Sequence, residues 1–176
     1  LSTNYFELPL MLSIIKDHYN TFKNVHLTQD QPISLVHFVT NRCNARCSFC
    51  FIDFDDPTVF AHELTTAEIE KLTSNIGRSL KNINITGGEP FARKDLSDIL
   101  NFYYSNTNIR SAFITTNGSL PDRVEKLCIE KDKNFSDRLL FFQISIDALP
   151  AEHNRIRKIN GLFEKAIESY RIATKF

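Results

Sequence analysis

Three of the four cysteines in the chain, Cys43, Cys47 and Cys50, follow one another with the spacing C-x3-C-x2-C. Thiols this close can converge on one metal ion or cluster, whereas near neighbours make strained disulfides and an odd number leaves one thiol unpaired. Thiolates hold iron–sulfur clusters, most of them through four cysteines. Because a set of three leaves one iron open, and an open metal position is where chemistry can occur, this stretch predicts a reactive cluster site.

A structural zinc site is the alternative interpretation of the same cysteines. It needs a fourth ligand, for which His37 and His62 are the nearest candidates. Zinc ligands usually come as a C-x2-C pair with a second pair further along the chain. The spacing therefore favours a cluster and leaves zinc open as an alternative.

The cysteine stretch, with Phe49 directly before the last cysteine, resembles the signature of the radical S-adenosylmethionine (SAM) enzymes. The resemblance implies that Cys43, Cys47 and Cys50 hold a [4Fe–4S] cluster, whose fourth iron is chelated by the amino and carboxylate groups of SAM. It also implies reductive cleavage of SAM, giving a 5′-deoxyadenosyl radical that abstracts a hydrogen atom from the substrate. Phe49 and the backbone beside it would contact the adenine. The protein itself then has to bind and orient these groups.

Strand and helix patterns alternate along the chain. The predicted strands are 33–40, 82–86, 109–116 and 139–147. The predicted helices are 65–80, 95–104, 120–131 and 162–174, the first of them opening on the capping box Thr65 to Glu68. This order implies an α/β fold with a parallel sheet and right-handed crossovers. A loop at the carboxyl end of the first strand is where barrels and open α/β sheets place their sites.

The same order of elements resembles the radical SAM barrel over residues 33–175. That family's core is a partial barrel of six β–α units, of which this chain supplies about four. The fifth strand, with its adenine-contacting motif, and the sixth are absent. We therefore predict a partial (β/α) barrel in residues 33–176, truncated at its C-terminal side, after an N-terminal extension of residues 1–32.

Two turns after predicted strands resemble further motifs of the family. Gly87, Gly88 and Glu89 resemble its Gly-Gly-Glu motif, which contacts the amino group of SAM, and two glycines also permit a close backbone approach. Asn117, within Thr-Asn-Gly, resembles a turn near the active-site face. Both stretches also suit ordinary turns. The resemblance implies that these residues bind the cofactor.

The last predicted strand carries polar residues on one face, Gln143, Ser145 and Asp147. Ser145 and Asp147 resemble the family's Ser-x-Asp near the ribose and methionine portions of SAM. The alternative is that these polar residues lie on the solvated face of an edge strand. The apolar run 139–142 favours a buried strand instead.

Arg157 resembles the arginine that binds the SAM carboxylate, a task suited to a guanidinium. Its alternative is a basic surface loop over residues 148–161.

Composition limits the remaining function classes. Lys plus Arg and Asp plus Glu both number 21, so no charge surplus indicates nucleic acid or an anionic membrane as partner. No apolar run reaches the length of a membrane span, and the first residues lack the apolar core of a signal peptide.

Free thiolates imply a reducing compartment, for which we expect the cytoplasm. Cys128 lies far from the other cysteines and fits a small buried hydrophobe.

The leading hypothesis is a radical SAM enzyme or the N-terminal part of its catalytic domain. The motifs resemble the branch of peptide-modifying maturases, sulfatase activators and the cyclase of molybdenum cofactor synthesis, which indicates a peptide or protein substrate. Such an enzyme needs a reductant such as flavodoxin or ferredoxin. The alternatives are a non-catalytic iron–sulfur relative, acting in binding or electron transfer, and a zinc-binding structural module.

Overall fold

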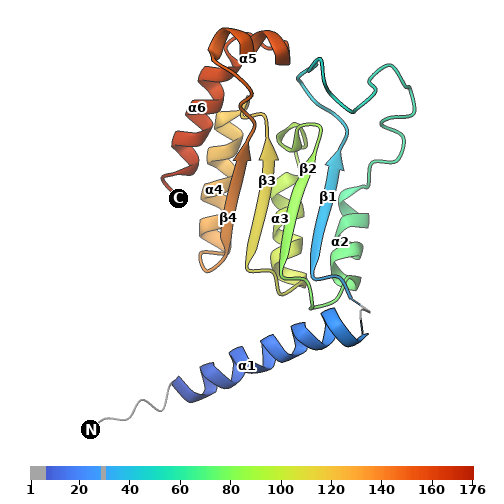
Figure 1. Cartoon of the computed structure of the whole chain (residues 1–176), viewed down its shortest axis with the longest axis vertical. Helices are drawn as coiled ribbons and strands as arrows, with labels where there is room; N and C mark the ends of the chain where they lie inside the picture. Colours follow the sequence, from blue (N-terminus) through green and yellow to red (C-terminus); the bar gives the residue numbers. More distant parts are fainter. Residues whose placement is uncertain (1–6, 29–30) are drawn as a thin grey trace.

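Four parallel strands form a single sheet in the order β1-β2-β3-β4. They are β1 (Ser34–Thr40), β2 (Asn82–Gly87), β3 (Ser111–Thr116) and β4 (Leu139–Ile144). The structure is a computed structural model and describes residues 7–28 and 31–176. The predicted α/β fold with a parallel sheet is confirmed, because each strand is joined to its neighbour by a crossover that contains a helix (Figure 1).

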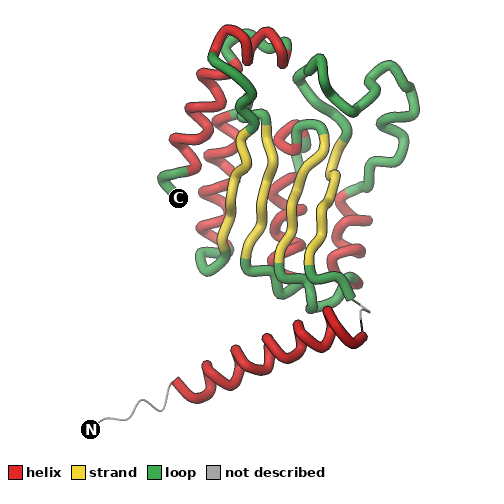
Figure 2. Tube along the Cα trace, viewed as in Figure 1, coloured by secondary structure: helices red, strands yellow, loops and turns green. Residues whose placement is uncertain are grey.

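Helices cover one face of this sheet and leave the opposite face open (Figures 1 and 2). The helices that follow β1, β2, β3 and β4 are α2 (Thr66–Asn75), α3 (Leu96–Asn106), α4 (Pro121–Asn134), α5 (Pro150–Arg157) and α6 (Leu162–Ala173). A short 3-10 helix, η2 (Pro90–Ala92), follows β2.

The core lies between the sheet and these helices. Strand residues such as Ile83, Ile85 and Ile114 are fully buried there, against Leu100 and Tyr103 of α3. Because side chains alternate along a strand, the neighbouring residues point to the open face. The prediction that Cys128 is a small buried hydrophobe is confirmed, since it lies in α4 beside the buried Val124 and Leu127.

The helix α1 (Glu7–Lys23) and the π-helical turn η1 (Asn24–Thr28) lie at the amino-terminal edge of the sheet, and α1 extends away from it (Figure 1). An ion pair joins Asp17 to Lys81, just before β2. The side chain of Asn24 is buried and donates to the carbonyl of Gln31 at 2.7 Å. The sequence predicts a turn over residues 29–32, of which residues 29 and 30 lie outside the described residues.

Three predicted boundaries are wrong by three residues or more. The helix predicted to end at residue 131 continues to Asn134. The helix predicted to reach residue 80 ends at Asn75, because Gly77 takes the left-handed conformation (φ 88°) that commonly ends a helix. The predicted strand 139–147 ends at Ile144, so Ser145 and Asp147 lie in the turn that follows it.

The predicted environments at the C-terminal side also need correction. The strand β4 lies at the edge of the sheet in this chain, and Leu139, Phe141 and Gln143 are exposed rather than buried. The predicted alternative of a basic loop is wrong for Arg157, which is buried at the end of α5. The spacing of apolar residues in 162–174 predicts Tyr170 on the apolar side of that helix, but its side chain is exposed.

In the described part of the chain, no helix combines the length and the apolar composition that crossing a bilayer requires.

Candidate functional site

The carboxyl ends of all four strands meet at one edge of the sheet, at the top of Figure 1. The cysteine loop, defined as residues 41–65, connects β1 to α2 at this edge. The turn at Gly88 and Glu89 follows β2, Asn117 follows β3, and Asp147 follows β4. Because parallel strands point the same way, the topology brings four predicted motifs to one edge.

The three cysteines of the loop are free thiols and partly buried. The backbone N–H of Ala45 donates to Sγ of Cys43 at 3.4 Å, and the N–H of Ile52 donates to Sγ of Cys50 at 3.4 Å. Burial raises the pKa of the Cys43 and Cys47 thiols, while the nearby Arg157 charge acts to lower the pKa of Cys47. N–H donors and a cation around sulfur suit thiolate ligands.

The close approach of the cysteine loop requires the two glycines at the end of β2, Gly87 and Gly88. A Cβ on Gly88 would lie 2.3 Å from the carbonyl oxygen of Arg42, and one on Gly87 would lie 2.2 Å from that of Thr40. In this approach Gly88 N–H donates to the Thr40 carbonyl at 2.7 Å, and Glu89 N–H donates to the Arg42 carbonyl at 2.8 Å. The backbone of the turn therefore extends the pairing of β1 and β2 into the loop.

Glu89 is completely buried, and both of its carboxylate oxygens accept hydrogen bonds. Oε1 accepts from the Phe91 N–H at 3.1 Å and from the Thr116 hydroxyl at 2.7 Å, and Oε2 accepts from the Asn117 N–H at 2.7 Å. Burial raises the pKa of Glu89, while these donors and the Arg157 charge act in the opposite direction. The carboxylate thus ties the end of β2 to the end of β3.

The Asn117 side chain continues this connection to the cysteines. Its amide Nδ2 donates to Oδ1 of Asn44 at 2.9 Å and lies 3.9 Å from Sγ of Cys43, within hydrogen-bond distance for sulfur. The amide of Asn44 in turn donates to the Ser119 hydroxyl at 2.8 Å. Asn44 and Ser119 were not predicted as site residues, since nothing in a lone asparagine or serine shows that two distant loops meet.

The helix α5 packs its C-terminal end on the cysteine loop. The carbonyls of Ile156 and Arg157 accept hydrogen bonds from the N–H groups of Ser48 and Arg46, both at 3.3 Å. The last carbonyls of a helix have no partner within it, so the loop satisfies two of them. The guanidinium of Arg157 lies 5.8 Å from the ring centroid of the exposed Phe49.

Asp147 orients the Arg157 side chain. The two form a bidentate ion pair, with Nε to Oδ2 at 2.7 Å and Nη2 to Oδ1 at 3.0 Å. These hydrogen bonds lower the pKa of Asp147. Nδ1 of the buried His153 accepts from the Asp147 N–H at 3.3 Å, and Ser145 donates its N–H to the Thr116 carbonyl at 3.0 Å. Two residues predicted to bind the cofactor are therefore each other's partners.

Within residues 7–28 and 31–176, the zinc interpretation finds no fourth ligand beside the cysteines. His37 lies on the helix-covered face, where its Nδ1 is 2.9 Å from the hydroxyl of the buried Tyr103. His62 is exposed in the cysteine loop. Among the described residues, no three His, Cys, Asp or Glu side chains gather closely enough to hold one metal ion.

A [4Fe–4S] cluster fits the same residues better. Such a cluster distributes its thiolates over separate irons, so the sulfurs need not converge on one point. Cys43, Cys47 and Cys50 share one loop, two of the sulfurs accept backbone N–H bonds, and Arg157 places a positive charge beside them. The donor set therefore suits a cluster rather than a single zinc ion.

Comparison with known families agrees with this geometry. The model of the Radical SAM superfamily matches residues 38–176, which include every motif described above. The chain belongs to the radical SAM superfamily. The cofactors of this family are a [4Fe–4S] cluster and SAM, and the predicted resemblance is confirmed.

Relatives of the chain carry the names of enzymes. It is 29% identical over 145 residues to the Fe-coproporphyrin III synthase of Methanosarcina barkeri, covering 81% of this chain and 34% of the relative. It is 33% identical over 129 residues to the GTP 3′,8-cyclase of Tolumonas auensis, covering 72% of this chain and 36% of the relative. Membership of this family and the names of both relatives indicate that the chain is part of an enzyme. The chain spans about a third of the length of each relative.

Solved structures share the fold. Native anSMEcpe with bound AdoMet matches with a TM-score of 0.60 at 19% identity, over 82% of this chain and 41% of the other. SuiB of Streptococcus suis, bound to the precursor peptide SuiA, matches with a TM-score of 0.61 at 17% identity, over 99% of this chain and 37% of the other. These likenesses confirm the partial-barrel fold.

Proposed function

We propose that the chain is the cluster-bearing part of a radical SAM enzyme, which cleaves SAM reductively and starts radical chemistry by hydrogen abstraction. The arrangement that carries this proposal is the cysteine loop held between Glu89, Asn117 and Arg157 at one edge of the sheet. The cluster, when bound by Cys43, Cys47 and Cys50, supplies the electron for SAM cleavage. The surrounding residues orient the loop and the cofactor.

We assign the cofactor-binding roles as follows. Arg157 binds the SAM carboxylate, since Nη1 makes no hydrogen bond to any residue in the described ranges while Asp147 fixes Nε and Nη2. Phe49, exposed and beside Arg157, contacts the adenine.

The turn of Gly87 and Gly88 presents backbone to the SAM amino group, close to the cysteine loop. Glu89 acts by holding this turn and Asn117, because it is buried with both oxygens occupied. Ser145 fixes the start of the turn that carries Asp147.

The substrate we propose is a peptide or protein. Support comes from the solved structures of the same fold, since SuiB was captured with its precursor peptide and anSMEcpe with the Kp18Cys peptide. The reductant is a small electron carrier such as flavodoxin or ferredoxin, because the family needs a reduced cluster. Free thiols at the site favour the cytoplasm as the compartment.

Low-temperature electron paramagnetic resonance (EPR) tests the proposal. The chain is reconstituted anaerobically with iron and sulfide, reduced with dithionite, and measured with and without SAM. We expect a reduced [4Fe–4S] signal that changes when SAM is added, because SAM binds the open iron. An EPR signal that stays the same when SAM is added supports the alternative of a non-catalytic iron–sulfur protein.

The cysteines provide a matched pair of variants for this experiment. Cys47→Ala removes a predicted ligand, and we expect it to lose iron and acid-labile sulfide. Cys128→Ala removes a buried cysteine in α4 and should retain both. Zinc bound without sulfide in the unmodified chain would overturn the cluster assignment.

A further inference from the structure

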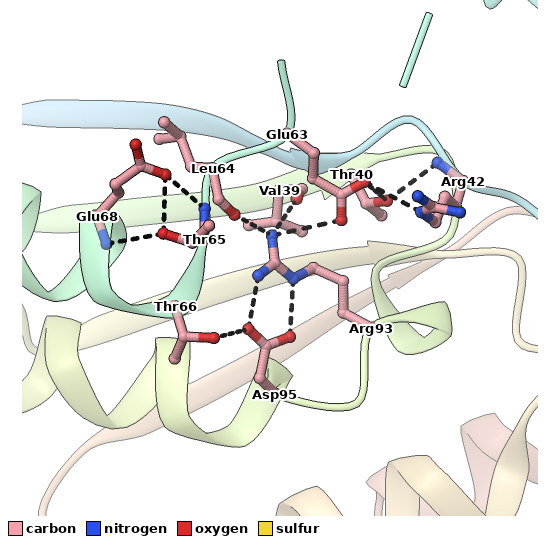
Figure 3. A network of polar contacts seen from close by, with 10 residues as sticks. All are labelled: Val39, Thr40, Arg42, Glu63, Leu64, Thr65, Thr66, Glu68, Arg93 and Asp95. Carbon is pink, nitrogen blue, oxygen red and sulfur yellow. Dashed lines mark hydrogen bonds and ion pairs between the residues drawn. The ribbon is translucent and has the colours of Figure 1, made fainter. Parts of the chain in front are cut away.

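Arg93 follows the Gly-Gly-Glu turn, and all three nitrogens of its guanidinium donate hydrogen bonds. Its side chain is 8% exposed. Nε donates to Oδ1 of Asp95 at 2.8 Å and Nη2 donates to Oδ2 at 2.5 Å. Nη1 donates to two backbone carbonyls, those of Val39 at 2.8 Å and Leu64 at 2.9 Å. Figure 3 shows these bonds converging on one planar group.

A second carboxylate extends these contacts. Oε1 of Glu63 lies 3.5 Å from Nη1 of Arg93. Oε2 of Glu63 accepts from the Thr40 hydroxyl at 3.1 Å and from Nε of Arg42 at 3.3 Å (Figure 3). On the other side of the guanidinium, Oδ2 of Asp95 accepts from the Thr66 hydroxyl at 2.5 Å. We call Arg93, Glu63, Asp95 and the carbonyls of Val39 and Leu64 the Arg93 clamp.

The segments that the clamp joins explain its importance. Val39 lies at the end of β1, where the chain enters the cysteine loop, and Leu64 lies where the chain leaves the loop for α2. Arg93 itself follows the Gly-Gly-Glu turn. Closing a loop costs conformational entropy, and one side chain bonded to both ends holds them together. The clamp therefore fixes the position of both ends of the cysteine loop relative to the turn after β2.

Arginine suits this position better than lysine. The planar guanidinium directs donors to a carboxylate on one side and to carbonyls on the other, whereas a lysine ammonium is a point charge without that fork. A buried cation also needs counter-charges, which Glu63 and Asp95 supply.

We propose that Arg93 is a positioning residue that fixes both ends of the cysteine loop against the Gly-Gly-Glu turn, and so determines how firmly the loop retains its cluster and binds SAM. This inference rests on the proposed function for the cluster and SAM. The effect on the loop itself does not.

Limited proteolysis of the chain without cluster tests the effect on the loop. Chymotrypsin cleaves after exposed aromatic residues, and Phe51 in the loop is exposed. We expect Arg93→Gln and Arg93→Lys to be cut in the loop at least about tenfold faster than the unmodified chain, because the loop ends open more often. Arg155→Gln is the matched control, since Arg155 is exposed and pairs with Glu152 of its own helix. It should be cut at the unmodified rate.

Cluster retention and SAM binding test the consequence. In the reconstituted chain, both Arg93 variants should lose iron to a chelator on the order of tenfold faster, and should need on the order of tenfold more SAM for half of the EPR change. Asp95→Asn should give the same change in smaller degree. The double variant that combines Arg93→Gln with Asp95→Asn should lose iron more slowly than the product of the two single effects predicts, because the two residues share one ion pair.

The outcomes separate this inference from the proposed function. Loop cleavage and iron loss at unmodified rates in both Arg93 variants would overturn the clamp. Unmodified behaviour of Arg93→Lys alone would overturn the need for the guanidinium fork. If Arg93→Gln fails to fold, Arg93→Lys decides, since it keeps the buried charge. If the unmodified chain assembles no cluster, the proposed function fails, and the proteolysis still decides the clamp.

Discussion

Asn117 connects the end of β3 to Cys43, the first cysteine of the loop. Its backbone is held by the buried Glu89, and its amide lies 3.9 Å from Sγ of Cys43. Hydrogen bonds to cluster sulfur stabilise the reduced, more negative state and raise the reduction potential. The geometry therefore predicts that the Asn117 amide influences the reduction potential of a cluster bound at Cys43.

Replacing Asn117 by Ala should lower the reduction potential of the cluster by an amount on the order of tens of millivolts. The measurement is an EPR-monitored redox titration of the reconstituted chain. Asn108→Ala is the control, because the Asn108 amide donates to the Arg78 carbonyl at the opposite edge of the sheet. Equal potentials in the Asn117 variant and the unmodified chain would show that this amide does not act on the cluster.

His37 makes the stability of the chain depend on pH. Burial lowers the pKa of His37 from 6.5 to about 4. The folded state therefore keeps it neutral while the unfolded chain binds a proton below pH 6.5, so stability is full above pH 6.5 and falls as the pH drops toward 4. The expected loss is on the order of 3 kcal/mol.

Urea unfolding at pH 7, 6, 5 and 4 measures this loss. His37→Gln, which keeps a polar partner for Tyr103, should show a shallower dependence over this range. Asp95 contributes mainly below this range, because its hydrogen bonds to Arg93 lower its pKa from 3.8 to about 2, so its share of the stability is lost mostly as the pH falls from 4 toward 2. Parallel pH curves for the variant and the unmodified chain would rule out His37 as the source.

At the scale of elements, the turn after β2 and the cysteine loop depend on each other. Gly88→Ala would place a Cβ 2.3 Å from the Arg42 carbonyl and should separate the two segments. We expect a loss of about 3 kcal/mol in unfolding free energy, together with weaker cluster binding. Chemical denaturation and iron content measure the two effects.

Gly161→Ala is the matched control for this steric argument. Gly161, unlike Gly88, has a positive φ of 68°, but its Cβ would meet nothing closer than 3.9 Å. Its cost should be the backbone strain alone, about 1 kcal/mol. If both glycine variants lost equal stability, the close approach would not be the cause at Gly88.

At the scale of the whole molecule, the sheet has one covered and one open face. A row of side chains on the open face passes from Val36 through Asn84 and Phe113 to Phe141, each paired in register with the next. The rings of Phe113 and Phe141 stack at 5.0 Å. Exposed apolar side chains in a row favour association or dye binding.

Two neighbouring residues test this difference between faces. Phe141→Thr should reduce binding of a hydrophobic dye and change the unfolding free energy by about 1 kcal/mol or less, because Phe141 is on the open face. Phe142→Thr should leave dye binding to the native chain unchanged and cost about 2 kcal/mol or more, because Phe142 packs on the buried Phe91. Equal losses of stability in the two variants would contradict the assignment of faces.

The sequence by itself determined the family and the alternation of the four strands with α2, α3, α4 and α6, but it did not predict α5. Alternating apolar patterns predicted all four strands, the capping box at Thr65 predicted the start of α2, and the cysteine spacing predicted a cluster. These features are local, because side-chain periodicity and short motifs depend on residues close in the chain. The boundaries after residues 75 and 144 were missed, since they depend on a single glycine conformation and on where pairing stops.

Only the tertiary structure decided which distant side chains meet. Arg93 bonds to both ends of the cysteine loop, Asn44 meets Asn117, and Asp147 occupies the guanidinium of Arg157. It also decided that Glu89 is buried with both oxygens bonded, and that β4 exposes alternate residues at the sheet edge. The physical reason is that these contacts join segments far apart in sequence, and parallel strand order alone brings them to one edge of the sheet.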